Sequence, residues 1–357
     1  MDIEKFLEET APQIDKAIEK YIPRKYSKDA VLFKVNPPMY SYTLRPLNKA
    51  IADPIWDMLD RGGKRWRPAL FLLICEALGK KADYCVVDFS IIPEVIHNGT
   101  LVIDDIEDSS EIRRGKPCTY KLFQIDIAVN AGNAMYYLPL LPLMTHKTKI
   151  SAEVQRDIYE VYVQEMINLS MGQAMDIAWH RGIANADELS EEDYLQMCAY
   201  KTGTLARMAA KMAAVLSGAE PRLVEKLGRF AESIGVAFQM QDDILDLTGQ
   251  EFAKSKGCVG GDITEGKRSL MVIYTLKKAS GADRKRLVEI LSMHTSDQKL
   301  RDEAIALMQK YGAMEYVKQT AQKMVVESWS EAEKLLPTPQ AKEKLKAFAE
   351  FLITRNK

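Results

Sequence analysis

The 357-residue sequence lacks the patterns that mark several common classes of protein. Its five cysteines are scattered without a C-x-x-C pair, which argues against a zinc-thiolate site or a disulfide framework and is typical of free thiols in a reducing compartment. Its four histidines form no H-E-x-x-H pair. No run of about eighteen apolar residues predicts a membrane span, and the acidic N-terminus lacks the features of a signal peptide. We therefore expect a cytoplasmic protein.

A strong charge of one sign is also missing. Lys and Arg number 49 against 50 Asp and Glu, which gives a net charge of −1. No global field therefore favours a nucleic acid or an anionic surface as partner. Charge is informative only where it is concentrated locally.

Alternating strand patterns and Gly/Pro/Ser linkers are nearly absent, whereas apolar residues recur at helical spacing. We predict an all-α protein with a single domain over 1–357, in which 1–45 form an N-terminal helix and arm. The expected helices are 2–22, 46–60, 68–79, 83–108, 121–143, 151–180, 190–217 and 221–246, followed by shorter ones.

Two acidic motifs of the form Asp-Asp-x-x-Asp end two of these helices. They are Asp104, Asp105 and Asp108, and Asp242, Asp243 and Asp246. Residues i and i+4 share a helix face, where like charges cost a few tenths of a kcal/mol. One such motif is as well explained by a solvated helix end. Two of them, each near a basic segment, favour a site for Mg²⁺, which is typically held by one or two carboxylates together with substrate phosphates.

Basic residues gather in three places, and both Arg and Lys are common partners of phosphate. The three groups are Lys64, Arg65 and Arg67; Arg113 and Arg114; and Lys201 with Lys256 and Lys267. The helices between them are apolar. Carboxylates, a metal ion and cations above an apolar interior describe a site for an amphipathic diphosphate.

With these motifs the chain resembles the trans-isoprenyl diphosphate synthases, and within them the eukaryotic-type geranylgeranyl diphosphate synthases. The matching stretches are Gly62–Pro68, Glu94–Gly115, Gly172–Asp176, Lys201–Gly203, Phe238–Asp246 and Asp262–Lys267. The resemblance implies an isoprenoid-synthase bundle of helices around a deep apolar cavity, and a homodimer. It implies Mg²⁺-dependent condensation of isopentenyl diphosphate with dimethylallyl, geranyl or farnesyl diphosphate.

The resemblance also implies roles for individual residues. Asp104, Asp108 and Asp242 are implied to hold Mg²⁺, as a group of about three ions that Mn²⁺ can replace. Asp105 and Asp243 complete the catalytic set, together with Arg113 and Lys201. The implied partners of the allylic diphosphate are Arg113, Lys201, Thr202, Gln239, Lys256 and Lys267, with Phe238 among the substrate-binding residues; those of isopentenyl diphosphate are Lys64, Arg67, His97 and Arg114.

Some of these residues have ordinary alternatives. Without the resemblance, His97 is as well explained as a core histidine, and Lys201 as a surface lysine. One extra residue before Asp262 leaves Lys254 as an alternative to Lys256.

The length of the product is a geometric question. Gly99 and Thr100 are small and lie one turn before Asp104, so we expect elongation past farnesyl. Tyr136 and Tyr137 match the aromatic pair of the geranylgeranyl subgroup and are the next candidates for a floor. Ser170 stands where that subgroup tends to carry histidine.

We expect geranylgeranyl diphosphate as the product. A farnesyl or a longer (C25 and above) synthase is the alternative. A class I terpene cyclase is disfavoured by the second acidic motif and the Lys64/Arg67/His97 group, and a non-catalytic partner subunit by the retention of both motifs.

Overall fold

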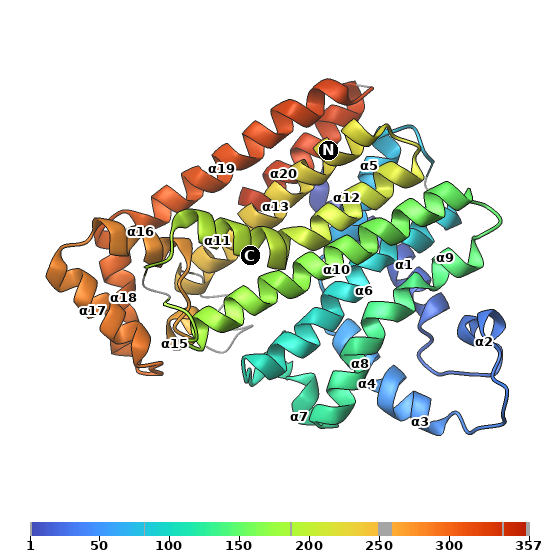
Figure 1. The fold of residues 1–357 in the computed structure, drawn as a ribbon, viewed down its shortest axis with the longest axis horizontal. Coiled ribbons are helices and arrows are strands. Elements are labelled where there is room, and N and C mark those ends of the chain that lie inside the picture. Colours follow the sequence, from blue (N-terminus) through green and yellow to red (C-terminus); the bar gives the residue numbers. More distant parts are fainter. Residues whose placement is uncertain (1, 82, 186–187, 249–258, 338, 355–357) are drawn as a thin grey trace. The chain divides into compact units, whose positions relative to one another are not determined.

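The structure is a computed structural model that describes residues 2–81, 83–185, 188–248, 259–337 and 339–354. In these ranges its regular secondary structure is helical apart from one two-stranded hairpin, which confirms the predicted all-α class. The first part of the chain contains α1 (Ile3–Tyr21), α2 (Val31–Val35), α3 (Arg45–Leu47), η1 (Asn48–Ala52), α4 (Asp53–Leu59), α5 (Trp66–Ala77), α6 (Tyr84–Glu107), β1 (Ile112–Arg113), β2 (Lys116–Pro117), α7 (Thr119–Phe123), α8 (Ile125–Tyr137), η2 (Leu138–Leu140) and α9 (Leu141–Thr145) (Figure 1).

The second part is built from longer helices. These are α10 (Ala152–His180), α11 (Glu191–Cys198), η4 (Ala199–Gly203), α12 (Thr204–Leu216), α13 (Pro221–Thr248), α15 (Gly261–Thr264), α16 (Leu270–Lys278), α17 (Gly281–Ser292), α18 (Gln298–Lys310), α19 (Ala313–Ala332), η5 (Glu333–Leu335) and α20 (Pro339–Thr354). The segments η1 and η4 are π-helical, and η2 and η5 are 3₁₀ turns.

By its internal contacts the chain divides into two compact units. Unit 1 comprises Met1–Val163, Met208–Gly228 and Leu335–Phe348, and unit 2 comprises Gln164–Arg207, Arg229–Lys334 and Ala349–Lys357. That residues 1–357 form a single domain stays a prediction.

Helix α6 forms the centre of unit 1, because it packs against α1, α5 and α8. It begins at Asp83, whose carboxylate accepts hydrogen bonds from the backbone N–H groups of Cys85 and Val86, both at 2.9 Å. Among the helices of the described residues, α6 alone is long and apolar enough to cross a membrane, over Cys85–Glu107, and 72% of that window is buried. Its position in the core accounts for its apolar composition.

Two glycines allow α6 and α8 to approach closely. A Cβ on Gly99 would lie 2.8 Å from Cβ of Met135, and one on Gly132 would lie 2.8 Å from Cδ1 of Ile103. The space that a side chain at Gly99 would fill is therefore taken by α8. Gly99 therefore serves the packing of α6 against α8. Of the two small residues, Thr100 remains the candidate for a position that leaves room for a longer product.

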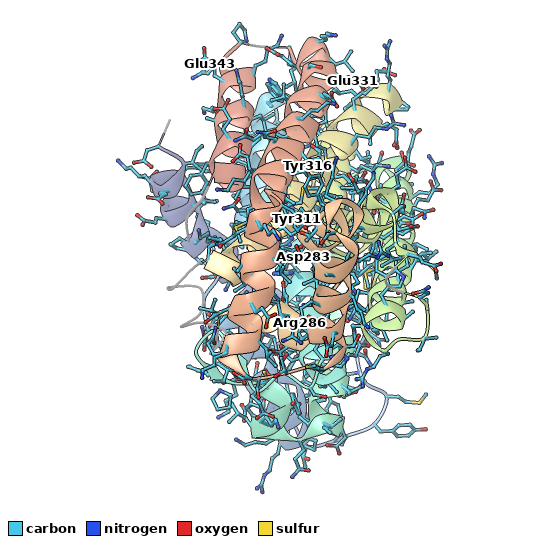
Figure 2. All side chains as sticks on the ribbon, turned by 90° about the vertical axis from the view of Figure 1, so that its left-hand side faces the viewer. Asp283, Arg286, Tyr311, Tyr316, Glu331 and Glu343 are labelled. Atoms are coloured by element: carbon cyan, nitrogen blue, oxygen red, sulfur yellow. The ribbon has the colours of Figure 1, made fainter. Side chains whose placement is uncertain are left out.

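Unit 2 contains a second group of packed helices near the C-terminal end. The rings of Tyr274 on α16 and Tyr316 on α19 stack at 4.0 Å between centroids. Tyr311, at the end of α18, donates a hydrogen bond of 2.7 Å to Asp283 in the first turn of α17 (Figure 2). These contacts tie α16–α19 together.

Some expected element boundaries differ from the structure. The expected helix 121–143 is broken at Gln124, whose φ is +73°, and again after Tyr137 by the 3₁₀ turn η2. The expected helix 190–217 is continuous but passes through the π-helical η4. The arm 24–45 contains the short α2, and the polar loop after α6 contains the β1–β2 hairpin. Helical periodicity does not reveal such local changes in backbone geometry.

A buried polar cluster joins α1, α6 and α9. Asp88 on α6 accepts hydrogen bonds from Lys20 and from the Tyr21 hydroxyl (2.6 Å), and its Oδ2 lies 2.7 Å from Nε2 of His146. Burial, and then Asp88, raises the pKa of Tyr21 well above its usual value, so its hydroxyl remains a donor. The cluster attaches the N-terminal helix to the core of unit 1.

We predict that Asp88→Asn lowers the free energy of unfolding by about 3 kcal/mol, because it leaves several buried groups without their anionic partner. Urea unfolding followed by circular dichroism measures this change. The exposed Asp302→Asn is the matched control and should change stability by less than about 0.5 kcal/mol. Equal effects of the two substitutions would contradict a structural role for the cluster.

Candidate active site

The first acidic motif occupies the last turn of α6. The backbone N–H of Asp108 donates a hydrogen bond of 2.8 Å to the carbonyl of Asp104, so the helical geometry continues through the motif. Asp104 and Asp108 are half-buried, whereas Asp105 is buried. The motif therefore presents two of its carboxylates near the helix surface and withdraws the third.

Asp105 holds Arg113. Its Oδ1 accepts hydrogen bonds from Nε (2.8 Å) and Nη2 of Arg113, and Asp104 lies farther from the same guanidinium, at 3.9 Å. Burial raises the pKa of Asp105, and the nearby Arg113 opposes that shift. The pair keeps Arg113 beside the exposed face of the acidic motif.

The β1–β2 hairpin presents the next arginine. Arg113 is opposite Lys116, and the two turn residues Arg114 and Gly115 have φ values of +50° and +74°. This left-handed pair is typical of a tight hairpin turn. The Arg114 guanidinium donates a hydrogen bond to the Gly62 carbonyl and another, 3.1 Å long, to Oδ1 of Asn98.

Glu94, buried in α6, organises the cations around it. It accepts hydrogen bonds from Nη1 of Arg65 (3.0 Å) and from Nδ2 of Asn98 (3.1 Å). The Oδ1 atom of Asn98 accepts the hydrogen bond from Arg114. One carboxylate thus positions one arginine directly and a second through an amide.

The buried Arg67 and the half-buried Arg114 and His97 form a group with an excess of positive charge. Burial lowers the pKa of Arg67 and that of Arg114 to about 10 each; Glu94 opposes both shifts, and neighbouring arginines add to them. Burial, followed by Arg67 and Arg114, lowers the pKa of His97 well below its usual value. At pH 7 the two guanidinium groups are therefore charged and the imidazole is neutral.

This group is arranged for an anion. Arg67 is only 4% exposed, and its Nε has no hydrogen-bond partner among the described residues. A buried donor without a partner is costly unless a ligand satisfies it. Lys64 lies exposed in the adjoining Gly62–Gly63 loop.

In unit 2, glycines bring the Lys201–Thr202 backbone against two helices. A Cβ on Gly172 of α10 would lie 2.3 Å from the Lys201 nitrogen, and one on Gly235 of α13 would lie 2.7 Å from Cα of Gly203. The close approach lets Lys201 pair with Asp176 of α10. It also lets Thr202 donate a hydrogen bond of 3.0 Å to Oε1 of Gln239 on α13.

The second acidic motif divides much as the first does. Asp242 is half-buried, whereas Asp243 and Asp246 are buried. Asp243 accepts hydrogen bonds from the Tyr194 hydroxyl (2.7 Å) and from Nε2 of Gln239 (2.8 Å). Burial and the negative charge of Asp262 raise the pKa of Asp243 to about 7.

Asp246 secures the segment that follows the motif. Its carboxylate accepts the backbone N–H of Asp262 at 3.0 Å, and its carbonyl accepts that of Gly260 at 2.9 Å. Asp262 in turn lies 3.3 Å from Nζ of Lys267. Lys256 and its alternative Lys254 lie outside the described residues, and Phe238 is half-buried on α13.

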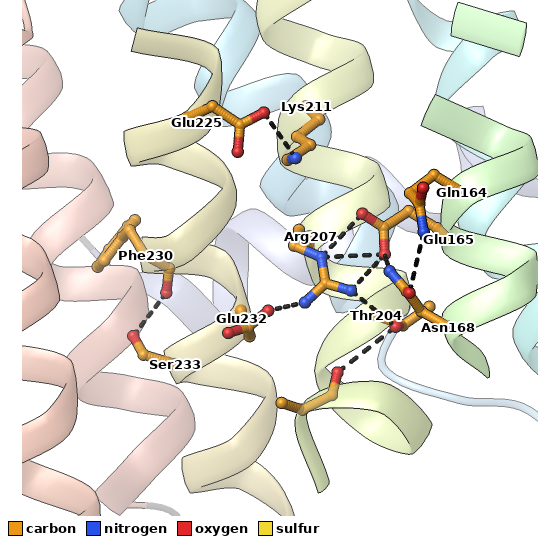
Figure 3. A network of polar contacts seen from close by, with 11 residues as sticks. Gln164, Glu165, Asn168, Thr204, Arg207, Lys211, Glu225, Phe230, Glu232 and Ser233 are labelled. Carbon is orange, nitrogen blue, oxygen red and sulfur yellow. Dashed lines mark hydrogen bonds and ion pairs between the residues drawn. The ribbon is translucent and has the colours of Figure 1, made fainter. Parts of the chain in front are cut away.

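An arginine network joins the helices that carry these groups. Arg207 on α12 donates two hydrogen bonds to Glu165 on α10 through Nε (2.8 Å) and Nη2 (2.6 Å), and its Nη1 pairs with Glu232 on α13. Nη2 also donates to the Thr204 hydroxyl at 3.1 Å (Figure 3). The network fixes α10, α12 and α13 relative to one another inside unit 2.

The expected chain-length residues have different environments. Tyr136 is half-buried, and its carbonyl accepts a hydrogen bond of 2.8 Å from Tyr162. Tyr137 is 67% exposed in this chain. Thr100 is half-buried and donates to the His97 carbonyl at 2.7 Å, and Ser170 is exposed.

Several residues of the site were not assigned roles from the sequence. They are Glu94, Asn98, Asp176, Tyr194, Asp262 and the Arg207–Glu165–Glu232 network. Glu94 and Asn98 both lie in the Glu94–Gly115 stretch that carries the resemblance. Their spacing of four residues could have indicated that the two side chains meet on one face of the helix.

The acidic residues suit a metal that is bound together with substrate. Among the described residues, no group of three or more His, Cys, Asp or Glu side chains forms a metal site. Asp104 and Asp108 offer two carboxylates one turn apart, and Asp242 offers another in unit 2. Mg²⁺ keeps several waters and accepts phosphate oxygens, so the pair of carboxylates in unit 1 and the single one in unit 2 each suit an ion whose other ligands are water and a diphosphate.

Known proteins are similar to this chain in sequence and in fold. Residues 48–308 match the family model of polyprenyl synthetases. The chain is 34% identical over 299 residues to a short chain isoprenyl diphosphate synthase of Methanothermobacter thermautotrophicus, covering 84% of this chain and 88% of that one. It is 30% identical over 316 residues to a geranylfarnesyl diphosphate synthase of Natronomonas pharaonis, with coverage of 84% and 88%.

A solved structure agrees over the whole length. The crystal structure of the geranylgeranyl pyrophosphate synthetase from Pyrococcus horikoshii is similar with a TM-score of 0.81 and 28% identity, covering 99% of this chain and 100% of that one. The expected isoprenoid-synthase fold is thereby confirmed. The chain belongs to the polyprenyl synthetase family, the trans-isoprenyl diphosphate synthases.

Proposed function

We propose that this trans-prenyltransferase condenses isopentenyl diphosphate with dimethylallyl, geranyl or farnesyl diphosphate and releases geranylgeranyl diphosphate. The observation that carries the proposal is the cationic group of the buried Arg67 and the half-buried Arg114, in which Nε of Arg67 has no partner among the described residues. A diphosphate supplies the negative charge and the acceptors that this group needs.

Isopentenyl diphosphate is assigned to that group in unit 1. Arg67 and Arg114 bind its diphosphate, with Lys64 contributing from the exposed loop. His97 is neutral at pH 7, so it acts as a hydrogen-bond partner that adds no charge. Glu94 and Asn98 are positioning residues, because they hold Arg114 without needing to contact the substrate.

The allylic diphosphate is assigned to the acidic motifs and the cations beside them. Asp104, Asp108 and Asp242 are the proposed Mg²⁺ ligands, and bound Mg²⁺ supplies positive charge to the departing diphosphate. Arg113 stays beside Asp104 because Asp105 holds its guanidinium. In unit 2, Lys201 is paired with Asp176 and Lys267 with Asp262. Each lysine can exchange its carboxylate partner for an arriving diphosphate.

These assignments give a balanced reaction. The allylic C–O bond breaks, and both of its electrons leave with the diphosphate. The double bond of isopentenyl diphosphate attacks the allylic carbon and forms the new C–C bond, and a proton is then lost to the departed diphosphate. Arg113, Lys201 and Lys267 stabilise the charge that develops on the leaving group, and no side-chain nucleophile is required. We also propose that the enzyme acts as a cytoplasmic homodimer.

The product length is proposed from positions on α6 and α8. Thr100 is small and half-buried one turn before Asp104, and Tyr136 is packed near Gly99, where its Cε1 would lie 3.2 Å from a Cβ. Thr100 leaves room for growth past farnesyl, and Tyr136 with Tyr137 provides the floor. A farnesyl or longer-chain product remains the alternative.

We predict that Arg67→Gln or Arg114→Gln raises the KM for isopentenyl diphosphate about 10- to 100-fold, because each removes a charge-assisted contact with the diphosphate. The KM for the allylic substrate should change far less. Steady-state kinetics with each substrate varied separately measures both values. Arg222→Gln, at an exposed position on α13, is the control. Equal increases in both KM values would contradict the assignment.

We predict that Asp104→Asn or Asp242→Asn lowers kcat about 10²- to 10³-fold and raises the Mg²⁺ concentration needed for half-maximal rate. Asp105→Asn should lower the rate through Arg113 while leaving the Mg²⁺ requirement near that of the wild type. Mg²⁺ titrations of each variant, after treatment with a chelator, separate the two effects. Undiminished activity in the presence of the chelator would refute a metal-dependent mechanism.

We predict that geranylgeranyl diphosphate is the main product from dimethylallyl, geranyl or farnesyl primers with isopentenyl diphosphate and Mg²⁺. Tyr136→Ala with Tyr137→Ala should lengthen the product, whereas Thr100→Phe should stop it at farnesyl. Chromatography of the dephosphorylated products measures their lengths, with the exposed Tyr40→Ala as control. Mainly farnesyl diphosphate from the shorter primers would contradict the proposed length.

A chain that is inactive alone but active with a partner would indicate a non-catalytic subunit.

A further inference from the structure

The arm between α1 and α4 is fixed at its base. The backbone N–H of Tyr26 donates a hydrogen bond of 2.6 Å to Oδ1 of Asn48, which ties the start of the arm to its end. Val31 and Leu32 of α2 pack against the core of unit 1. The connection from α2 to α3 can be followed in Figure 1.

The tip of this arm, residues 36–43, is exposed throughout. Its sequence, Asn-Pro-Pro-Met-Tyr-Ser-Tyr-Thr, contains no charged residue. Met39 is 86% exposed and Tyr40 is 79% exposed, the highest values for large hydrophobic side chains among the described residues. Single exposed apolar residues are ordinary, but a contiguous group of them indicates an interaction surface.

A chain of aromatic rings supports the tip. The Tyr42 ring lies 5.9 Å from that of Phe33, which lies 6.1 Å from that of the buried Tyr26. The tip therefore projects from a packed base, so little ordering is needed before it binds a partner.

The flanks of the tip are cationic although the whole chain is nearly neutral. Residues 24–49 contain six Lys or Arg and one acidic residue, Asp29, whereas the complete chain has a net charge of −1. Arg24 pairs with Asp60, and Lys49 with Asp53. The other four cations, all exposed, are Lys25, Lys28, Lys34 and Arg45.

We propose that residues 36–43 and these four cations dock the protein onto the surface of an anionic lipid bilayer. Tyrosine is suited to the interface between headgroups and hydrocarbon, and Lys and Arg are attracted to anionic headgroups. Stable attachment at a membrane surface generally needs two such signals, and the arm supplies both. Docking would release a lipophilic product beside the bilayer; this consequence alone rests on the proposed function.

Vesicle co-sedimentation of the full-length protein tests the proposal. We expect binding to phosphatidylglycerol–phosphatidylcholine vesicles at low salt, and weaker binding to pure phosphatidylcholine or at high salt. Met39→Ser with Tyr40→Ser, and separately Lys34→Glu with Arg45→Glu, should each reduce binding about tenfold or more. The control combines Met293→Ser and Val326→Ser, which remove exposed apolar side chains elsewhere.

Vesicle binding can be tested separately from the prenyl transfer activity. The rate with short primers in the absence of vesicles should be the same for all variants, since none of these residues belongs to the proposed active site. Failure of the wild-type protein to bind anionic vesicles would overturn the proposal, as would equal loss of binding in the control. A change in oligomeric state on substituting Met39 and Tyr40, seen by sedimentation, would instead assign the tip to a second copy of the chain.

Discussion

The site in unit 1 depends on positive charge that is buried beside a single well-placed carboxylate. Glu94 offsets part of the charge by binding Arg65 directly and Arg114 through Asn98. Arg67 remains buried, with a lowered pKa and an Nε that no described residue satisfies. Such an arrangement is unfavourable by itself and becomes favourable when an anion arrives. The fold therefore gives up some stability to keep this cationic group, which we propose binds a diphosphate.

Close helix packing positions the corresponding groups in unit 2. Glycines at 172, 203 and 235 let the π-helical segment η4 touch both α10 and α13, so Lys201 and Thr202 reach partners on opposite sides. The Arg207 network then holds α10 and α13 to α12, the helix that follows η4, through charge-assisted hydrogen bonds. Here the backbone approach decides where the side chains lie, and the network keeps the helices in place.

The two acidic motifs agree in the burial of their first two aspartates and differ in the third. Asp104, Asp108 and Asp242 keep partial exposure, whereas Asp105, Asp243 and Asp246 are buried with protein partners. A helix places neighbouring side chains about 100° apart, so consecutive aspartates point in different directions. The first aspartate of each motif is therefore partly exposed, where we propose that it binds Mg²⁺, while the second holds Arg113 or Tyr194.

The sequence alone was sufficient for the all-α class, most long helices and the family, because helical periodicity and ordered motifs are local properties of the chain. It also indicated the cations and carboxylates of the proposed site. Only the tertiary structure decided that Gly99 serves packing against α8, since the atoms that a Cβ at this position would meet depend on which helix lies opposite. It likewise assigned Glu94, Asn98 and Arg207 their partners, which are separated by up to 42 positions in sequence and meet only when the helices pack.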